Sequence, residues 1–411
     1  MLSARYHDRR EPHDPSSPVL PGDLAVRRPS FLTLIALTGA FALLSSTMAK
    51  TPALPLFARA LGAPPSLIGW AVMVSTIPGI LVSLPAGLLR DRIGTKPLLL
   101  GALFVFASAP FLYLLVRTID QLALIRFYHG FATAIFGTVV GAEIVARYPA
   151  DRGHALGVYS AISTVGRSLA PFLGGALISL SGFPAVYIGC AVAGVLALTL
   201  GTQTSTELVP PQASRKDPFT YHLAAVLTDH LVLATSVVEA VQYLVFGSVE
   251  AFLAVYTAHH GWPAWRIGLL LGVQLAVVVL FKPRLGHLSD RYGRRPMILS
   301  GLALGALAVA ALPFTAQFPP LLIINAVFGA GFAATTAATG ALVGDRARSG
   351  GFGASIGVLR SIMDIGQAIG PVLTGLLIQT GGYRIAFVTL AALLGASGGL
   401  FALTANKAHL I

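Results

Sequence analysis

Charged side chains and cysteines are scarce in this sequence. Only 11% of its 411 residues are charged, whereas a soluble domain carries roughly 25%. Because 55% of the residues are hydrophobic, the shortage of charge argues against a soluble fold and indicates a chain that lies mostly in lipid. The single cysteine, Cys190, excludes a framework of intrachain disulfide bonds.

Sequence motifs of nucleotide-driven pumps and of metalloproteases are also missing. The chain contains no G-x-x-x-x-G-K-[ST] phosphate loop, so we do not expect ATP bound by this chain to drive it. It contains no H-E-x-x-H zinc motif either. We therefore predict that the protein is not an enzyme and that it needs no metal and no cofactor.

The net charge of +12 would suit a nucleic-acid partner. The basic residues, however, lie in short hinges between apolar runs and do not form one continuous face. We therefore expect no nucleic acid among the partners of this protein.

Long apolar runs fill the chain from Phe31 onward. A helix needs about 20 apolar residues to cross a bilayer. The sequence contains twelve such runs, at 31–58, 67–89, 98–116, 121–146, 155–180, 183–203, 230–257, 265–288, 297–315, 320–344, 353–379 and 383–406. The polar segment 204–229 divides them into six and six. Pro52 and Pro55 lie inside the first run, and membrane helices tolerate prolines where neighbouring helices satisfy the freed carbonyls.

Lysine and arginine are distributed unequally between alternate loops. With the N-terminus inside, 18 of them lie on the cytoplasmic side and four on the outside, at Arg59, Arg117, Arg266 and Arg384. By the positive-inside rule, this bias predicts that both termini are cytoplasmic. Residues 1–30 are polar and lack the apolar core of a cleavable signal peptide, so we interpret them as a cytoplasmic tail.

Two charged hairpins are near copies of each other. Gly286–Pro296 reads GHLSDRYGRRP and Gly87–Pro97 reads GLLRDRIGTKP, with six of eleven positions identical. A second repeat, offset by 200 residues, links runs 155–180 and 353–379; its small residues and prolines are Gly157, Gly166, Pro171, Gly174 and Gly175, and Gly357, Gly366, Gly370, Pro371 and Gly375. The two repeats indicate a duplication, and small residues at such spacing let helix backbones approach closely.

These motifs resemble those of the major facilitator superfamily over residues 31–406. The family's loop signature G-x-x-x-D-R-x-G-R-[RK] fits Gly286, Asp290, Arg291, Gly293, Arg294 and Arg295, and it fits Gly87, Asp91, Arg92, Gly94 and Lys96 with Thr95 in place of an arginine. Leu122, Arg126 and Gly130 match the L-x-x-x-R-x-x-Q-G motif of its drug–proton exporters, with His129 in place of the glutamine. The glycine and proline pattern of run 155–180 is similar to their antiporter signature, with Ala170 replacing one glycine.

The resemblance implies an all-α membrane protein with twelve transmembrane helices in two pseudo-symmetric six-helix bundles around a central cavity. We accordingly predict a cytoplasmic polar tail at 1–30, an N-terminal bundle at 31–203, a cytoplasmic linker at 204–229 and a C-terminal bundle at 230–406. We expect a monomer in the lipid bilayer of the inner cell membrane, crossing it many times.

Polar side chains inside the runs are the candidates for a substrate or proton pathway, because an ionisable group in a membrane helix is costly and usually faces protein or water. They are Lys50, Arg126, His129, Arg167, Glu239, Gln242, Tyr243, Glu250 and Asp364. Residues 239, 242, 243, 246 and 250 share one helix face. A carboxyl group in an apolar site can take up and release protons near neutral pH, which makes Glu239 and Glu250 the first choices for the proton carrier.

Several of these residues have alternative interpretations. Lys50 and Glu250 either form a pair across the cavity between the halves or a structural pair away from the substrate. The resemblance implies that Arg126 takes part in proton transfer or substrate binding, and His129, one turn away, is a second proton site or a neutral core histidine. Arg167 requires a carboxylate partner or an anionic substrate, and we expect Asp364 to pair with Arg360.

The positive-inside rule explains the basic residues of the hairpins but not their two aspartates. The resemblance implies that Asp91 and Asp290 each latch the opposite half at the inner face in one conformation. We predict Glu143 as a partner of Arg92, and Asp345 as a partner of Arg291, because both acids lie near the cytoplasmic ends of their runs.

The sequence thus favours a secondary active transporter that works by alternating access and exports a small organic compound or drug in exchange for protons. The excess of intramembrane cations indicates an anionic or zwitterionic substrate. The same excess of cations leaves open a second interpretation, proton-coupled uptake of a carboxylate or a phosphorylated metabolite. A membrane receptor without transport activity and a polytopic enzyme are the alternatives of a different class.

Overall fold

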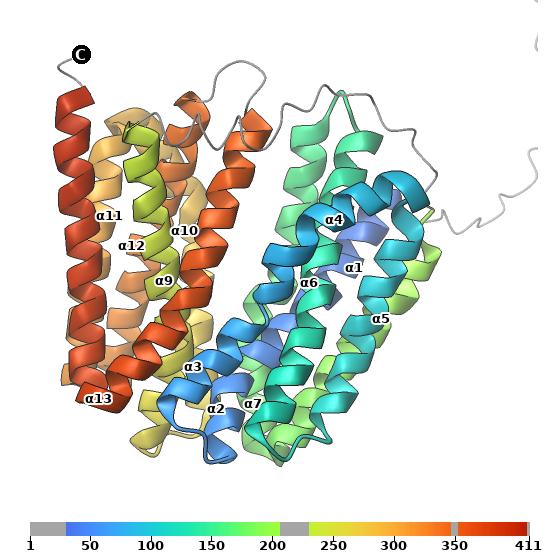
Figure 1. Cartoon of the computed structure of the whole chain (residues 1–411), viewed down its shortest axis with the longest axis horizontal. Helices are drawn as coiled ribbons and strands as arrows, with labels where there is room; N and C mark the ends of the chain where they lie inside the picture. The colour runs from blue at the N-terminus through green and yellow to red at the C-terminus, as the bar shows by residue number, and fades with distance from the viewer. Residues whose placement is uncertain (1–29, 206–229, 347–351, 409–411) are drawn as a thin grey trace, which may run out of the picture. The chain divides into compact units, whose positions relative to one another are not determined.

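The computed structural model describes residues 30–205, 230–346 and 352–408. The predictions for the tail at 1–29 and for most of the linker lie outside this range. The described elements are all helical: α1 (Phe31–Lys50), α2 (Ala53–Ala60), α3 (Pro65–Val74), α4 (Ile77–Ile93), α5 (Thr95–Tyr113), α6 (Ile119–Arg147), α7 (Arg152–Gln203), α9 (His230–His259), α10 (Ala264–Tyr292), α11 (Arg294–Ala311), the 3-10 turn η1 (Leu312–Phe314), α12 (Phe318–Arg346) and α13 (Phe352–Ala408) (Figure 1).

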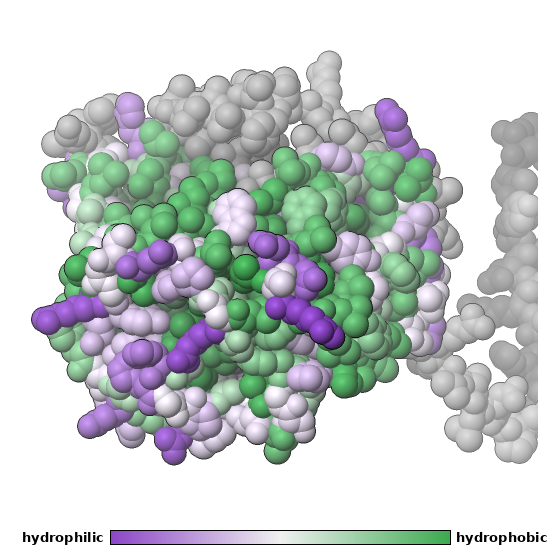
Figure 2. Space-filling view, turned by 60° about the horizontal axis from the view of Figure 1, so that its bottom comes forward, coloured by the Kyte–Doolittle hydropathy of each residue, from purple (hydrophilic) through white to green (hydrophobic). Residues whose placement is uncertain are grey.

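Nine helical segments of the described chain are long and apolar enough to cross a membrane. Their outward faces carry large hydrophobic side chains that water would not favour; Leu180 and Leu307, for example, are 79% and 70% exposed. Hydrophobic colour covers much of the surface in Figure 2, and hydrophilic side chains stand in separate groups. Exposed apolar surface of this extent is expected of a surface that faces lipid.

Two of the predicted runs are broken where a proline interrupts the helix. The run 31–58 is not one continuous helix, because α1 ends at Lys50 and α2 begins at Ala53, on either side of Pro52. Proline has no backbone N–H, and its ring clashes with the preceding turn. The run 67–89 is likewise divided into α3 and α4, and the break at Ser75 and Thr76 lies just before Pro78.

Two long helices, α7 and α13, each change direction at a glycine. Gly182 and Gly382 have φ values of +75°, a conformation that other residues rarely adopt. These turns fall between the predicted runs 155–180 and 183–203, and between 353–379 and 383–406. The short gaps in the apolar pattern therefore located both turns correctly.

The glycine repeat brings helix backbones together in the same way in both parts of the chain. We call residues 31–205 the N-half and residues 230–408 the C-half. In the N-half, a Cβ atom on Gly166 of α7 would lie 1.9 Å from the carbonyl oxygen of Ala40 in α1. In the C-half, a Cβ atom on Gly366 of α13 would lie 2.2 Å from the carbonyl oxygen of Ala240 in α9. Both pairs differ by 200 positions, so the repeat preserves the contact as well as the residue type.

A second set of close approaches joins the two halves. A Cβ on Gly175 of α7 would lie 2.5 Å from the carbonyl oxygen of Ala264 in α10, and a Cβ on Gly375 of α13 would lie 2.3 Å from that of Pro65 in α3. These contacts involve the N-terminal ends of α3 and α10, and α7 therefore packs on α10 as α13 packs on α3. Gly157 has no neighbour within 4 Å of such an atom, and the surroundings of Gly357 lie outside the described residues.

Replacing Gly166 or Gly366 with alanine should destabilise the protein, because the added methyl group overlaps a backbone carbonyl that cannot move aside without shifting a helix. Overpacking of this kind costs about 1–3 kcal/mol. Gly157→Ala is the matched control on the same helix, and it should leave stability unchanged or slightly raised. Thermal unfolding in detergent measures all three variants, and equal melting temperatures would refute the packing role of the repeat.

Candidate functional site

An ion pair joins the two halves where α1 ends. Lys50 is the last residue of α1, and its Nζ lies 2.8 Å from Oε2 of Glu250 on α9. The Thr51 hydroxyl donates to the other oxygen, Oε1, at 2.7 Å. The pair that the sequence suggested between Lys50 and Glu250 is therefore present, and both carboxylate oxygens are occupied. The cavity beside it holds about 10 Å³, room for no more than one water molecule.

The ion pair belongs to an end of the protein at which the halves are in contact. The approaches of Gly175 to α10 and of Gly375 to α3 lie toward this same end, where α2 also contacts α9. The two charged hairpins lie at the opposite ends of their helices. The structure therefore shows a conformation that is closed at the end marked by Lys50 and Glu250.

Arg126 lies at the centre of a buried polar cluster in the N-half. It is 4% exposed on α6, and its Nη2 donates to the Ser75 hydroxyl at 2.8 Å while Nη1 donates to Oη of Tyr113 at 3.3 Å. His129 Nδ1 lies 3.3 Å from the same Tyr113 oxygen, and the Tyr113 ring stacks on Tyr187 at 4.6 Å. The break between α3 and α4 places Ser75 within reach of the guanidinium.

This cluster holds a positive charge that no carboxylate of the described chain pairs with. Arg126 Nε, His129 Nε2 and the Tyr187 hydroxyl have no hydrogen-bond partner among the described residues, and the partners of Arg126 are neutral hydroxyls. Burying a charge without a counter-charge is costly. Arg126 therefore has unused capacity to bind an anion.

The C-half holds a buried carboxyl group in place of a buried cation. Glu239 on α9 is 1% exposed; the Thr339 hydroxyl of α12 donates to its Oε1, and Oε2 has no partner among the described residues. Lys282 of α10 lies near enough for its charge to act on Glu239. One turn along α9, Gln242 is fully buried, and neither of its amide atoms finds a partner in the described chain.

Arg167 lies near Glu250 and near Lys282 but bonds to neither of them. Its charge acts on Glu250 and on Lys282, yet its exposed side chain forms no hydrogen bond or ion pair with any described residue. The carboxylate partner that the sequence required is therefore not found at bonding distance, since Glu250 is held by Lys50 and Thr51. The other partner that we expected for Arg167 from the sequence was an anionic substrate, and this stays a prediction.

Tyr243 and Asp364 are the two remaining candidates for the substrate or proton pathway. Tyr243 is partly exposed on α9 and meets the ring of Phe332 edge-on at 5.2 Å. Asp364 is exposed on α13. The side chain of Arg360 lies outside the described residues, so its pairing with Asp364 stays a prediction.

Glu143 does not pair with Arg92 as predicted. Its Oε2 accepts from the Thr95 hydroxyl at 2.5 Å and lies 3.5 Å from Arg90. Arg90 and Arg92 are two positions apart on α4, so their side chains leave the helix on nearly opposite faces. Only Arg90 faces α6, and Arg92 is exposed.

Asp345 pairs with Arg294 at 3.1 Å and not with Arg291. Arg294 begins α11, directly after the hairpin glycine, and it also forms an ion pair with Asp290. Arg291 is exposed in the last turn of α10, where its guanidinium lies 5.6 Å from the ring centre of Tyr292. In this conformation Asp290 is therefore held within its own half.

The remaining hairpin residues close the turns and cap a helix. Gly94 and Gly293 have φ values of +86° and +96° and connect successive helices without a loop. Gly87 and Gly286 face Thr138 of α6 and Ala337 of α12, at 3.9 Å and 4.0 Å from an added Cβ.

Lys96 caps the end of α7. Its Nζ donates to the carbonyls of Gly201 at 3.0 Å, Thr202 at 2.8 Å and Thr204. A cation at a helix C-terminus satisfies carbonyls that have no partner within the helix. Arg295 is partly buried in the first turn of α11, and the side chain of Asp91 lies outside the described residues.

Sequence reasoning missed Ser75, Tyr113 and Thr339, which hold the two buried groups. Hydroxyl side chains are frequent in apolar helices, where most of them bond to their own backbone four residues earlier. The Thr339 hydroxyl also lies 2.8 Å from the carbonyl oxygen of Thr335, so its spacing in the sequence does not distinguish it from the other hydroxyls. The only available signal was the proline at 78, which places a helix break beside Ser75.

Helices with apolar outer faces, buried charges between them and two matching halves define a multi-pass membrane transporter. The model of the Major Facilitator Superfamily matches residues 34–273 and 235–409, so this chain belongs to that family. Members and structural neighbours of the family are transporters of small molecules and not enzymes.

Curated relatives support this membership at low identity. The chain is 22% identical over 331 residues to an uncharacterized MFS-type transporter of Methanocaldococcus jannaschii, covering 79% of this chain and 86% of that protein. It is 25% identical over 382 residues to the multidrug resistance protein MdtG of Citrobacter koseri, covering 90% and 94%. The predicted resemblance to the drug–proton antiporters of the family is therefore confirmed.

Solved structures show the same fold. The nucleoside transporter NupG superposes with a TM-score of 0.77 at 12% identity, covering 92% of this chain and 99% of that one. A bacterial homolog of the human lysosomal transporter Spinster, in an inward-facing and unoccupied conformation, gives 0.79 at 16% identity, covering 92% and 96%. The human organic anion transporter MFSD10 gives 0.64 at 18% identity, covering 91% and 100%.

Removing the charge of Glu250 should loosen the closed end, because Lys50 is left without its carboxylate. We expect a cysteine introduced at Ala251, which is 3% exposed, to react several-fold faster with a maleimide in Glu250→Gln than in the parent, both in a Cys190→Ala background. The exchanged pair, Lys50→Glu with Glu250→Lys, should restore slow labelling. Equal rates in all three proteins would show that the ion pair does not close this end.

Proposed function

We propose that this protein is a proton-coupled exporter of small organic compounds. The observation that carries the proposal is Glu239, a carboxyl group buried between membrane helices with one oxygen bound by Thr339 and the other without a partner. Such a group can accept a proton without breaking an ion pair. The similarity to multidrug resistance protein MdtG favours export over uptake.

In the proposed architecture, the chain crosses the inner cell membrane twelve times and both termini lie in the cytoplasm. We propose that the protein is a monomer. Nine helical segments of the described chain are long enough to span. The turns at Gly182 and Gly382 divide two of them, and α3 with α4 supplies the length of one more. The unequal distribution of lysine and arginine supports this orientation.

In the proposed cycle, two sets of charges hold the halves at opposite ends. The pair of Lys50 and Glu250 keeps the outer end closed, and its separation lets α1 and α9 part. At the inner end, Asp290 exchanges its present partner Arg294 for a contact on the N-half when that end closes. A few polar contacts then separate the two conformations, as a ligand-driven switch requires.

The substrate that best fits the charges inside the predicted runs carries a negative group. Arg126 and Arg167 have no carboxylate partner in the described chain, and an anion would satisfy either of them. The same observation favours the second candidate, proton-coupled uptake of a carboxylate or a phosphorylated metabolite. The direction of substrate flux distinguishes export from uptake. In exchange, the substrate crosses the membrane in the direction opposite to the protons, and in symport it crosses in the same direction as the protons.

Glu239→Gln should uncouple transport from the proton gradient, because the amide cannot carry a proton. A pH gradient of one unit supports up to about tenfold accumulation per proton exchanged. In proteoliposomes screened with carboxyfluorescein as an anionic probe and ethidium as a cationic one, the transported probe should equilibrate but no longer accumulate in this variant.

Asp120→Asn is the matched control for Glu239→Gln, since Asp120 is an exposed carboxylate in the first turn of α6. It should accumulate the probe like the parent protein. Undiminished accumulation by Glu239→Gln, with Glu250→Gln also coupled, would place the proton site elsewhere.

Asp290→Asn and Arg294→Ala should each slow transport at least about tenfold, the effect of losing roughly 1.4 kcal/mol from one conformation. Arg291→Ala should have a smaller effect, because Arg291 is exposed and contacts only the ring of Tyr292. Probe flux and melting temperature are measured together, so that a folding defect is recognised. Normal flux in Asp290→Asn would refute the latch.

A further inference from the structure

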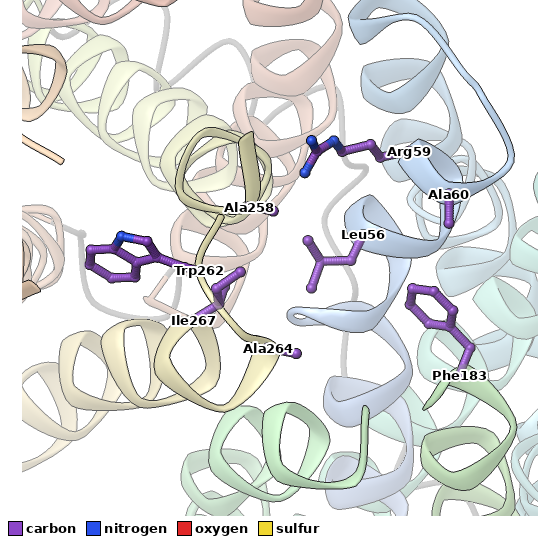
Figure 3. A pocket seen from close by; sticks show the side chains of 8 residues that line it. All are labelled: Leu56, Arg59, Ala60, Phe183, Ala258, Trp262, Ala264 and Ile267. Atoms are coloured by element: carbon purple, nitrogen blue, oxygen red, sulfur yellow. The ribbon is translucent and has the colours of Figure 1, made fainter. Parts of the chain in front are cut away.

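A second cavity opens between the two halves near the outer end. Its volume is about 320 Å³, within the range of sites that bind small organic ligands, about 300–1,000 Å³. The N-half contributes residues of α2 and of the second part of α7, and the C-half contributes the end of α9 and the start of α10; the lining residues are Leu56, Arg59, Ala60, Phe183, Ala258, Trp262, Ala264 and Ile267 (Figure 3). None of the transport candidates described above lines it.

The lining combines an apolar wall with one exposed cation that has no protein partner in the described chain. Seven of the eight residues are apolar or aromatic, and the indole N–H of Trp262 is already satisfied by the carbonyl of Ala316 at 3.1 Å. The exposed side chain of Arg59 forms no hydrogen bond or ion pair with any described residue. In Figure 3 its side chain reaches from α2 toward the helix end that carries Ala258.

Two other arginines near this end of the protein lie against aromatic rings. The guanidinium of Arg384 lies 4.7 Å from the ring centre of Phe314, and that of Arg266 lies 5.2 Å from the ring centre of Trp265. Arg59 has no aromatic ring beneath it among the described contacts. A cation without a partner at the edge of an apolar cavity attracts a molecule with one negative group and an apolar body.

We propose that this cavity binds an amphipathic organic anion, with its carboxylate, sulfonate or phosphate on Arg59 and its apolar body against Leu56, Phe183 and Ile267. A fatty acid of medium chain length and the headgroup region of an anionic lipid share this chemistry. Guanidinium groups bind such oxyanions through charge-assisted hydrogen bonds, which are roughly twice as strong as neutral ones.

Occupancy of the cavity should hold the outer end closed. The ligand contacts α2 and α7 on one side and α9 and α10 on the other, so its site exists only while the two halves are in contact at this end. A ligand that binds one conformation shifts the equilibrium toward it. An amphipathic anion at Arg59 therefore slows the exporter from outside; this consequence rests on the proposed function, whereas the binding does not.

Binding is tested by fluorescence in nanodiscs of phosphatidylcholine. Trp70 and Trp265 are replaced by Phe, which leaves Trp262 as the only tryptophan of the chain. The probe is ω-bromodecanoate, whose bromine quenches a neighbouring indole, and ω-bromodecanol is its neutral counterpart. We expect saturable quenching by the acid, and quenching by the alcohol that only follows its concentration in the membrane.

Matched variants assign the site. Arg59→Gln should weaken ω-bromodecanoate at least about tenfold, the loss expected for one hydrogen bond to a charged group. Arg59→Lys should stay within a few-fold of the parent, and Arg384→Gln should be unchanged. Ala258→Leu, which fills the cavity from the C-half, should also weaken the acid, and it serves as the test if Arg59→Gln fails to fold.

Equal quenching by acid and alcohol, or equal affinity in Arg59→Gln, Ala258→Leu and the parent, would overturn the proposal. Nanodiscs that contain phosphatidylglycerol identify the source of the anion: competition with ω-bromodecanoate assigns the site to a lipid headgroup, and its absence assigns it to a free amphiphile. The assay uses neither a transported substrate nor a pH gradient, so a failure of the export proposal leaves the binding result intact.

Discussion

The ion pair between Lys50 and Glu250 is the interaction on which this conformation depends. It crosses from the N-half to the C-half at the break that Pro52 makes in the first span, and Thr51 satisfies the second carboxylate oxygen. In a medium of low dielectric, the attraction within such a pair offsets the cost of desolvating the two charges only where their hydrogen bonds are complete. Its charges become costly when separated, so the end that it closes opens only if water or a ligand replaces each partner.

The glycine repeat holds the helices of each half together, as the proposed movement of the halves would require. Within each half, α7 lies against α1 and α13 lies against α9 at backbone contact distance, through Gly166 and Gly366. Contacts this close pack these helix pairs tightly within each half. The contacts between halves, at Gly175 and Gly375, involve the same two helices about two and a half turns further on. One repeated motif therefore builds both the units and the surface along which they meet.

Much of this arrangement could be predicted from the sequence, because the length of an apolar run, and a proline or glycine within or beside it, determine the local helix and its ends. The turns at Gly182 and Gly382 followed from gaps in the apolar pattern, and the pair of Lys50 and Glu250 followed from the repeat and the opposite charges of the two residues. The partners of Glu143 and Asp345 could not be predicted in the same way: the choice between Arg90 and Arg92 depends on which helix face meets α6, and sequence distance does not determine it. The roles of Tyr113 and Thr339 are likewise set by packing between helices.

The two halves have kept one fold but divided the charges between them. The N-half buries Arg126 among hydroxyls, and the C-half buries Glu239 beside Thr339. Neither group has a partner of opposite charge at hydrogen-bond distance in the described chain, and Arg167 lies near the charges of Glu250 and Lys282. An anion bound by the cations and a proton bound by the carboxyl group would each lower the cost of burial in one half. This division would give a physical basis for the proposed coupling, because each proposed ligand would stabilise one half.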